Sequence, residues 1–473
     1  MQAATHLHWF RQDLRLRDNP ALAQCLSQGE TIALYHYETA TESHHEIGAA
    51  GKWWLHHSLN ALNTSLNHHL MLTQGNALVE IPKLCERHGI QSVCWNQTYE
   101  PWRVEQDRKL QEILRKLGIT VEIFNGSLLW QPEAITKDDG TPYRVFTPFY
   151  RKGCLHATPP RKPLDAPALT SLLPRSDDSL NLDDLHLLPE VKWDESIAAA
   201  WTPGETAGLE RLDAFITHGL AHYKKGRNIP AKPYVSRLSP YLHWGEISPH
   251  QAWYAALACG NDENVDHFLS ELGWREFSYY LLHHNPDLQS TNIQTKFNAF
   301  PWAENESGLK AWQTGRTGIP IVDAGMRELW QTGYMHNRVR MIVGSFLVKN
   351  LLLHWHHGEA WFRDCLVDAD LASNSASWQW IAGCGADAAP YFRIFNPVTQ
   401  GEKFDPDGAY TKKYVPELAK LPPSLLFAPW EAPALALREA GVELGHTYPH
   451  PIVDLKSSRE RALAAFATLK KPS

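Results

Sequence analysis

The chain has 473 residues, of which 43% are hydrophobic and 21% are charged, and its formal net charge is −7. This length predicts two domains rather than one, and the composition, which has no low-complexity segment, excludes an intrinsically disordered chain. Because the overall charge is negative, nucleic acid could be bound only by a local basic face.

The seven cysteines are scattered and form no Cys-x-x-Cys pair, which is against a zinc site, a redox dithiol or an iron–sulfur cluster. The N-terminal residues lack the apolar core of a signal peptide, and no apolar run approaches the roughly 18 residues of a membrane span. We therefore expect a protein of the reducing cytoplasm. Two histidine groups, His44–His45 and His354, His356 and His357, lack acids at metal-ligand spacing. We interpret them as surface and packing residues and expect no metal site.

Residues 6–130 alternate short apolar runs with segments of helical periodicity. Strands are predicted at residues 6–10, 31–38, 70–75, 92–97 and 120–126, and helices at 49–68, 76–88 and 102–117. The alternation predicts a Rossmann-like α/β domain over residues 1–130, with a five-stranded parallel sheet covered by helices. No Gly-x-Gly-x-x-Gly follows the first strand, so the usual dinucleotide fingerprint is absent. The carboxyl edge of the sheet can still hold a ligand.

Residues 131–200 are rich in proline and polar side chains and predict a long interdomain linker with at most short helices. Beyond the linker, the alternation of strands is missing. Helices are predicted at residues 205–220, 239–258, 264–283, 321–332, 336–354, 358–366 and 455–469. We therefore expect an all-helical domain over residues 201–473.

Glu271, Trp274 and Arg275 are spaced so that they lie on one face of a predicted helix. An acid, a flat aromatic ring and a cation together suit a flat polar ligand. On this motif alone, an amphipathic helix with a surface ion pair is the better explanation.

The helix predicted at 336–354 has one face made of Asn337, Arg340, Met341 and Gly344. An arginine on a largely apolar helix needs an acid or a phosphate as its partner, and Asp368 and Asp370 are the candidate acids. Met341 alone is typical of core packing. Arg338 points away from this face.

The helix predicted at 239–258 begins with Ser239 and is preceded by Tyr223, Arg227, Ser236 and Arg237. Hydroxyls and free N–H groups at a helix start suit an anion such as a pyrophosphate. A plain helix N-cap is the commoner use of such serines.

Trp378 and Trp380 are two residues apart and would point to nearly opposite sides of a helix, so they cannot line one pocket wall together. Trp302 and Trp355 lie on other segments. The sequence does not decide whether they form a chain with Trp378 in space.

Several long stretches resemble the photolyase/cryptochrome family, in the family's order from about residue 6 to 465. The stretches are WFRQDLRLRDNPAL, SRLSPYLHWGEIS, ELGWREF, TGIPIVDAGMREL, MHNRVRMIVGSFLVKN and the segment from Leu366 through PYFRIFNPVTQGEKFDP. Within the family, the chain is most similar to the bacterial cyclobutane pyrimidine dimer photolyases.

The resemblance implies an α/β domain, a linker and a helical domain that holds FAD. The positions that match FAD-binding residues of the family are Tyr223, Val235, Ser236, Arg237, Leu238, Ser239, Arg340, Asp368, Ala369, Asp370 and Asn374. By this match, Arg340 lies over the flavin with Asp368 as its partner, and Asn374 lies near the flavin N5. Val235 stands where a threonine is common, which puts one hydroxyl contact to the phosphates in doubt.

The resemblance also implies a site for a pyrimidine dimer flipped out of duplex DNA. The positions that match dimer-binding, catalytic residues are Glu271, Trp274, Asn337, Met341 and Trp380. Those that match contacts to the DNA backbone or the lesion edge are Arg227, Arg275, Arg338, Arg393 and Gln400. Trp302, Trp355 and Trp378 match the relay that photoreduces FAD. The implied enzyme is a monomeric deoxyribodipyrimidine photo-lyase, in which excited reduced FAD donates an electron to the dimer and the cyclobutane ring splits.

The family includes three alternatives to a cyclobutane dimer photolyase. A (6-4) photolyase would normally carry histidines in place of Asn337 and Met341, and a DASH cryptochrome tends to lack Trp274, Trp380 or both. A signalling cryptochrome usually bears a long C-terminal extension, and this chain ends at Ser473. These features favour repair of cyclobutane dimers, with a blue-light photoreceptor or a (6-4) photolyase as the alternatives.

A second, antenna chromophore is expected in the α/β domain if one is present. Folate-binding members of the family often have an acid after a Tyr-Glu pair, whereas Trp102 and Arg103 stand near that place here. A folate bound in the usual manner is therefore in doubt, and a deazaflavin, a flavin or no antenna are the other possibilities.

Overall fold

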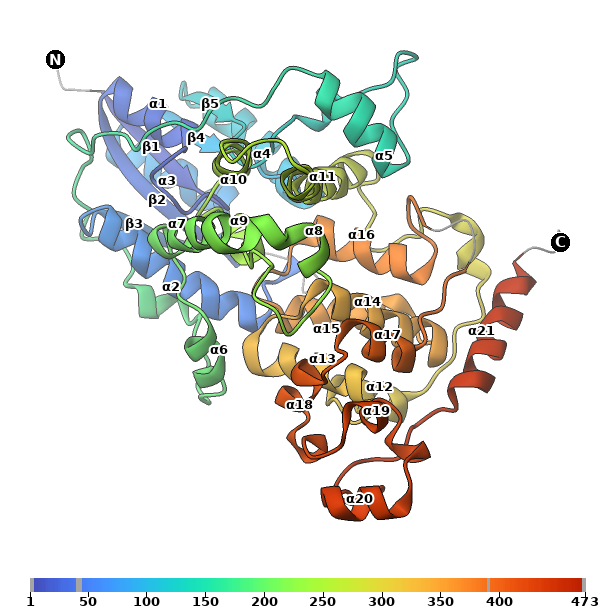
Figure 1. Cartoon of the computed structure of the whole chain (residues 1–473). Coiled ribbons are helices and arrows are strands. Elements are labelled where there is room, and N and C mark those ends of the chain that lie inside the picture. Colours follow the sequence, from blue (N-terminus) through green and yellow to red (C-terminus); the bar gives the residue numbers. More distant parts are fainter. Residues whose placement is uncertain (1–3, 40–44, 389–391, 470–473) are drawn as a thin grey trace. The chain divides into compact units, whose positions relative to one another are not determined.

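The computed structural model describes residues 4–39, 45–388 and 392–469. The chain forms two compact units, each made of two segments (Figure 1). Unit 1 comprises Met1–Ala221 and Ser236–Pro286, and unit 2 comprises His222–Val235 and Asp287–Ser473. The domain limits predicted from the sequence, 1–130, 131–200 and 201–473, stay a prediction.

Unit 1 contains a parallel five-stranded sheet with the strand order β3-β2-β1-β4-β5 (Figure 1). The strands are β1 Thr5–Phe10, β2 Glu30–Glu38, β3 Leu70–Gly75, β4 Ile90–Asn96 and β5 Thr120–Phe124. Leu7 of β1 is paired with Ile32 of β2 on one side and with Val93 of β4 on the other. The central strand β1 is buried from His6 to Phe10, whereas the edge strand β5 is only partly buried along its length. The α/β fold class predicted from the sequence is confirmed.

Helices cover both faces of this sheet. The helices are α1 Pro20–Gln28, α2 Ala49–Ser65, α3 Ala77–His88 and α4 Pro101–Lys116. Val93 packs in the cluster that includes residues of α3 and α4, whereas its neighbour Cys94 packs with Ala21 and Cys25 of α1. Successive side chains of a strand point to opposite faces, so α1 lies opposite α3 and α4. Helix α1 was not predicted, although Asn19 caps it at the Leu22 N–H.

The segment that follows the sheet has little regular structure, as expected for residues 131–200. It contains the single turn of α5 Phe146–Pro148 and the short helix α6 Glu195–Ala200. Backbone hydrogen bonds fix it to the sheet: Leu173 N–H donates to the Thr31 carbonyl and Leu180 N–H donates to the Leu72 carbonyl.

The remaining helices of unit 1 are α7 Glu205–Ala214, α9 Ser239–His243, α10 Pro249–Leu257 and α11 Glu263–His284. The single helix predicted at 239–258 is wrong, because the chain leaves the helical path at Gly245. The φ angle of Gly245 is +68°, and a Cβ there would lie 2.0 Å from the Gln12 carbonyl oxygen. The need for glycine comes from a segment far away in the sequence, so helical periodicity could not reveal it.

The described part of unit 2 is helical. Its helices are α8 Tyr223–Gly226, α12 Glu306–Gln313, α13 Pro320–Thr332, α14 Asn337–Ser345, α15 Trp355–Cys365, α16 Leu371–Ala382, α17 Pro397–Phe404, α18 Ala409–Tyr414, α19 Pro423–Leu426, α20 Ala434–Ala440 and α21 Leu455–Thr468. One hydrophobic cluster joins α12 to α16 with α18 and α21. The helix predicted at 336–354 is too long, since α14 is followed by a π-helical turn over Phe346–Asn350 and Leu352 has a φ angle of +58°. None of the described helices is long and apolar enough to span a bilayer.

Candidate functional site

Arg340 of α14 forms the ion pair with Asp368 that the sequence predicted. The guanidinium Nη2 lies 3.1 and 2.9 Å from the two carboxylate oxygens, and Nε donates to the Met335 carbonyl at 2.7 Å. Asp368 is almost fully buried, whereas the Arg340 side chain is 26% exposed. Burial opposes the charge on Arg340, but the Asp368 carboxylate outweighs burial and raises the pKa of the guanidinium. A fixed positive group therefore lies at a partly open surface of unit 2.

The segment after Asp368 positions two further predicted residues. Asp370 caps α16, because its carboxylate accepts the Ser373 N–H at 2.7 Å, and Ala369 lies between the two acids. The Asn374 side-chain amide donates to the carbonyl and the carboxyl Oε1 of Glu359, each at 3.1 Å. Burial raises the pKa of Glu359. Glu359 thus orients the Asn374 amide, a role that no sequence motif indicated.

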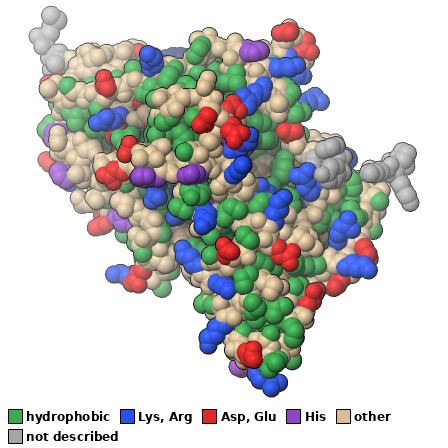
Figure 2. All heavy atoms as spheres, viewed as in Figure 1, with side chains coloured by type: hydrophobic (Ala, Val, Ile, Leu, Met, Phe, Trp, Pro, Cys, Tyr) green, Lys and Arg blue, Asp and Glu red, His purple; other side chains and the backbone are tan. Residues whose placement is uncertain are grey.

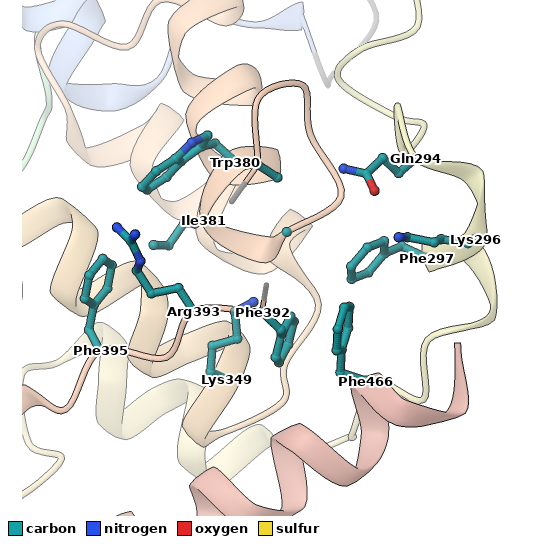
Figure 3. A pocket seen from close by; sticks show the side chains of 12 residues that line it. Gln294, Lys296, Phe297, Lys349, Trp380, Ile381, Phe392, Arg393, Phe395 and Phe466 are labelled. Carbon is teal, nitrogen blue, oxygen red and sulfur yellow. The ribbon is translucent and has the colours of Figure 1, made fainter. Parts of the chain in front are cut away.

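Trp378 and Trp380 point in different directions from α16, as their spacing predicted. Trp378 is 3% exposed, and its ring lies edge-on to those of Phe362 and Trp312, with centroid separations of 5.0 and 6.2 Å. Trp380 is partly exposed and its indole N–H donates to the Asp387 carbonyl at 3.2 Å. One tryptophan is therefore part of the core and the other lines a cavity (Figure 3).

The two other relay candidates are joined by a histidine. The His354 ring centroid lies 5.0 Å from that of Trp302 and 5.7 Å from that of Trp355. Trp355 is fully buried and its indole N–H donates to Asn292 Oδ1 at 2.9 Å. Trp355 and Trp378 belong to the same hydrophobic cluster, and Trp302 packs against it. His354, one of the histidines predicted to be surface and packing residues, therefore packs between two tryptophans.

A cavity of about 160 Å³ lies beside Trp380. Figure 3 shows Arg393 and Phe395 on one side and Gln294 and Lys296 on the other. Lys349 reaches into this cavity, where its Nζ lies 3.1 Å from the Phe392 ring centroid and donates to the Ala382 carbonyl at 2.8 Å. Burial lowers the pKa of Lys349 far below its ordinary value. Exposed Arg393 is thus the stronger cation for an external anion.

The start of α14 holds buried polar atoms that lack hydrogen-bond partners among the described residues. They are His336 Nε2 and Arg338 Nε. Burial, followed by the charge of Arg227, lowers the pKa of Arg338, and burial with three nearby arginines lowers the pKa of His336 to about 3. Arg338 also contacts Asn228 and the Met341 sulfur, and Asn337 is exposed beside it. Unpaired buried donors among positive charges suit a polar or anionic ligand.

The phosphate-side candidates are divided between the units, because the boundary falls between Val235 and Ser236. In unit 2, the Arg227 guanidinium lies 5.6 Å from the Tyr223 ring centroid. In unit 1, the Ser236 hydroxyl accepts the Leu238 N–H at 3.4 Å, and Arg237 has a φ angle of +53° and lies over the Trp201 ring. Ser239 begins α9, which has no side-chain cap. The N-cap explanation therefore does not account for these serines.

The lesion-binding candidates of α11 share one face, as predicted. Glu271 is partly exposed, and its Oε1 lies 3.7 Å from His267 Nε2. Trp274 stacks on Phe146 with a centroid separation of 3.8 Å. Arg275 donates to the Ser127 carbonyl at 2.8 Å and so fixes that segment to α11. Phe146 comes from the irregular segment before α6, where no pattern pointed to a role.

Charged side chains on the drawn face of the molecule are mixed. Figure 2 shows Lys and Arg side chains scattered among acidic and hydrophobic ones. On this face, cations that contact DNA would therefore act as single side chains rather than as one continuous basic block. Gln400 lies on α17, partly exposed, in the same unit as Arg393.

The carboxyl edge of the sheet in unit 1 also contains buried polar atoms without partners among the described residues. They are Arg11 Nη2, just beyond the end of β1, Asn96 Oδ1, in the last residue of β4, and Thr98 Oγ1, two residues further on. The other Arg11 nitrogen donates to Asp107 at 2.8 Å. The strand order reverses between β1 and β4, which is where α/β sheets bind ligands.

The residues of unit 2 fit the part of FAD that the sequence assigned to them. The partly open Arg340–Asp368 pair offers a cation beside an acceptor, the Asn374 amide is held in one orientation, and unpaired donors lie at the start of α14. A flavin presents imide and phosphate groups that such residues bind.

Comparisons with known proteins agree with this arrangement. The family model described as DNA photolyase matches residues 6–168, and the one described as FAD binding domain of DNA photolyase matches residues 268–468. The deoxyribodipyrimidine photo-lyase of Agrobacterium fabrum is 48% identical over 100% of this chain and 99% of its own. Cryptochrome-1 of Arabidopsis thaliana is 36% identical over 98% of this chain and 70% of its own. The crystal structure of a class III photolyase from Agrobacterium tumefaciens has a TM-score of 0.95 at 48% identity, covering 100% of this chain and 99% of its own.

The chain belongs to the photolyase/cryptochrome family. The family and the FAD-binding helical segment predicted from the motifs are thereby confirmed. The roles of the individual residues stay predictions.

The packing of the Trp378 ring against α15 and α14 can be tested by substituting the two glycines that lie next to it. A Cβ on Gly358 of α15 would lie 2.1 Å from the Trp378 ring, whereas one on Gly344 of α14 would lie 3.6 Å from it. We expect Gly358→Ala to lower the free energy of unfolding by about 1–3 kcal/mol through overpacking. Gly344→Ala should leave the free energy of unfolding unchanged or raise it by up to about 1 kcal/mol, because alanine favours a helix. Urea unfolding monitored by tryptophan fluorescence measures both, and equal effects would contradict this seat for Trp378.

Proposed function

We propose that this protein repairs cyclobutane pyrimidine dimers in DNA, using light absorbed by FAD to split the dimer. The observation that carries the proposal is the divergence of Trp378 and Trp380 on one helix. Trp378 faces the core, and Trp380 lines a cavity together with Arg393. The relative that is 48% identical over its whole length is a deoxyribodipyrimidine photo-lyase. The family acts on DNA, and the enzyme class, a carbon–carbon lyase, follows from this assignment.

When bound and reduced, FAD supplies the light-driven electron that opens the cyclobutane ring. The protein's own residues would hold it and set its charge. Arg340, with its raised pKa, keeps a permanent positive charge that favours an anionic flavin ring, and Asp368 fixes that guanidinium. Asn374, oriented by Glu359, presents its amide beside the ring. Tyr223 and the segment from Val235 to Ser239 would bind the phosphate side.

The lesion would be bound by residues that match the needs of a flipped dinucleotide. In unit 1, Trp274 offers a flat apolar face and the Glu271 carboxyl group is a hydrogen-bond partner for the imide edge of the dimer. In unit 2, Trp380 offers a second flat apolar face. Asn337 and Met341 stand where a (6-4) photolyase would carry histidines, which favours the cyclobutane dimer.

The cations assigned to DNA would neutralise phosphates around the lesion. They are Arg227, Arg275, Arg338 and Arg393, with Gln400 as a neutral contact. Arg275 is bound by the Ser127 carbonyl and Glu276, so its share in DNA binding would depend on its remaining N–H groups.

Trp302, Trp355 and Trp378 would pass electrons from the surface of unit 2 toward the flavin and so keep it reduced. The alternative function is that of a cryptochrome-type photoreceptor, which would use the same relay for signalling. Cryptochrome-1 of Arabidopsis thaliana matches 98% of this chain. Repair of a thymine dimer in duplex DNA under blue light separates the two, because a photoreceptor leaves the dimer intact.

We also infer a second, antenna chromophore at the carboxyl edge of the sheet, where buried polar atoms lack protein partners. Its identity as a deazaflavin, a folate or a flavin is open. The chain is further proposed to act as a cytoplasmic monomer. The seven free thiols suit a reducing compartment.

The relay is tested by Trp378→Phe. Phenylalanine fills most of the ring's volume but is far harder to oxidise, so photoreduction of oxidised FAD should be blocked. Repair by enzyme that has been reduced chemically should be spared, because that step needs no relay. Flavin absorbance under illumination measures the first and loss of dimers the second, with Trp130→Phe of unit 1 as the control. Equal loss of both activities would contradict the relay role.

The dimer site is tested by Glu271→Ala. Loss of the carboxyl group should lower the repair yield several-fold while FAD stays bound, because Glu271 is assigned to the dimer alone. Dimer repair and the flavin-to-protein absorbance ratio are measured on the same samples. Glu263→Ala, which removes an exposed acid from the first turn of the same helix, is the matched control. A Glu271 variant that simply loses FAD would show that the residue has been misplaced.

The antenna is tested by Thr98→Val, which removes a buried hydroxyl that has no described partner. Protein purified from its native host should release a second chromophore besides FAD on denaturation, as seen in the absorption spectrum of the supernatant. The variant should hold less of that chromophore and an unchanged amount of FAD. Recovery of FAD alone from the wild-type protein would refute the antenna.

A further inference from the structure

The relay candidates Trp302 and Trp355 are separated by an aromatic ring that belongs to neither of them. The His354 ring lies edge-on to Trp302, at 5.0 Å and an interplanar angle of 63°, and nearly parallel to Trp355, at 5.7 Å and 28°. All three rings belong to unit 2. A single side chain therefore contacts both the buried and the outer indole of the predicted relay.

The position of His354 is fixed by the backbone of the helix that it begins. His354 is the N-cap of α15, and its Nδ1 accepts the His356 N–H at 3.2 Å. An accepting Nδ1 carries no proton, so the ring is the neutral tautomer with its proton on Nε2. Burial, followed by the neighbouring His356 and His357, lowers the pKa of His354 to about 4. The ring is therefore uncharged at neutral pH and does not oppose a positive charge that forms on an adjacent indole.

The outer indole, that of Trp302, differs from the Trp355 indole in its hydrogen bonding. Trp302 Nε1 is buried without a hydrogen-bond acceptor among the described residues. The Trp355 indole, by contrast, donates to Asn292. An oxidised Trp302 thus has no described protein group to take its proton, and the positive charge must be tolerated by the rings around it, of which His354 is one.

We propose that His354 is a positioning residue of the electron relay, which bridges Trp355 and Trp302 through its neutral ring. The inference rests on the proposed relay. One electron leaves Trp302 and reaches oxidised Trp355, so that Trp355 returns to its neutral state and Trp302 carries the positive charge. A small-molecule thiol in solution then returns one electron to Trp302. No covalent bond of the protein forms or breaks in this step.

Two substitutions separate the bridging role from the capping role. His354→Phe keeps an aromatic ring between the indoles but loses the acceptor for the His356 N–H. His354→Asn keeps a good N-cap but removes the ring. His356→Asn is the matched control, because His356 lies on the same turn and contacts the rings of Trp355 at 4.0 Å and His354 at 4.3 Å. Trp302→Phe is the reference for a relay without its outer indole.

The readouts are the yield of the long-lived tryptophan radical in transient absorption, the rate of flavin photoreduction with a thiol, and the thermal midpoint of the FAD-free protein. We expect His354→Asn to lower the radical yield and the photoreduction rate several-fold, toward Trp302→Phe, with little change in midpoint. His354→Phe should stay close to wild type in both electron-transfer readouts while its midpoint falls by a few degrees. His356→Asn should behave as wild type.

Normal radical yield in His354→Asn, or an equal loss in His354→Phe, would overturn the bridging role. Dimer repair by chemically reduced protein should be the same in all variants. If the wild-type protein repairs no dimer, the proposed function fails. If it repairs dimers but His354→Asn photoreduces normally, only the inference about His354 fails.

Discussion

The Trp378 ring fills a space that two glycines leave on neighbouring helices, and this packing holds the functional part of unit 2 together. Gly358 of α15 lets the ring lie directly on the helix backbone, and Gly344 of α14 stands at ordinary contact distance from it. Since interiors are close-packed, a ring seated in this way fixes how α14, α15 and α16 lie on one another. The residues from Arg340 to Asn374 that are assigned to the flavin are carried by these helices or by the residues between them, whereas Tyr223 and Val235 belong to the separate segment His222–Val235.

Two polar links join the same helices and place charge at the site. The Arg340–Asp368 pair connects α14 with the segment before α16, and Asn374 of α16 hydrogen-bonds to Glu359 of α15. A partly buried ion pair contributes little net stability, because desolvation offsets much of the attraction. Its value is that it presents one fixed positive charge to a ligand. Packing thus supplies the rigidity of the site, and the polar links supply its electrostatics.

The α16 helix separates two environments because of a simple geometric fact. Two tryptophans two residues apart must diverge, so one is sealed in the core and the other reaches an open cavity. The core-facing ring belongs to a hydrophobic cluster that also contains Trp355, and Trp302 packs against this cluster and contacts Trp355 through His354. One helix therefore carries both a candidate of the electron relay, Trp378, and a candidate of the dimer site, Trp380.

The sequence by itself determined the parallel sheet, the helical character of the C-terminal part, the family and the divergence of Trp378 and Trp380. These features follow from local periodicity and from motifs that are contiguous in the chain. Only the tertiary structure decided that Trp274 stacks on Phe146 and that the helical path breaks at Gly245 against Gln12. It likewise decided that the His354 ring lies between those of Trp302 and Trp355. Each of these contacts joins segments whose proximity depends on how helices pack, and packing is a property of the whole unit that no local pattern encodes.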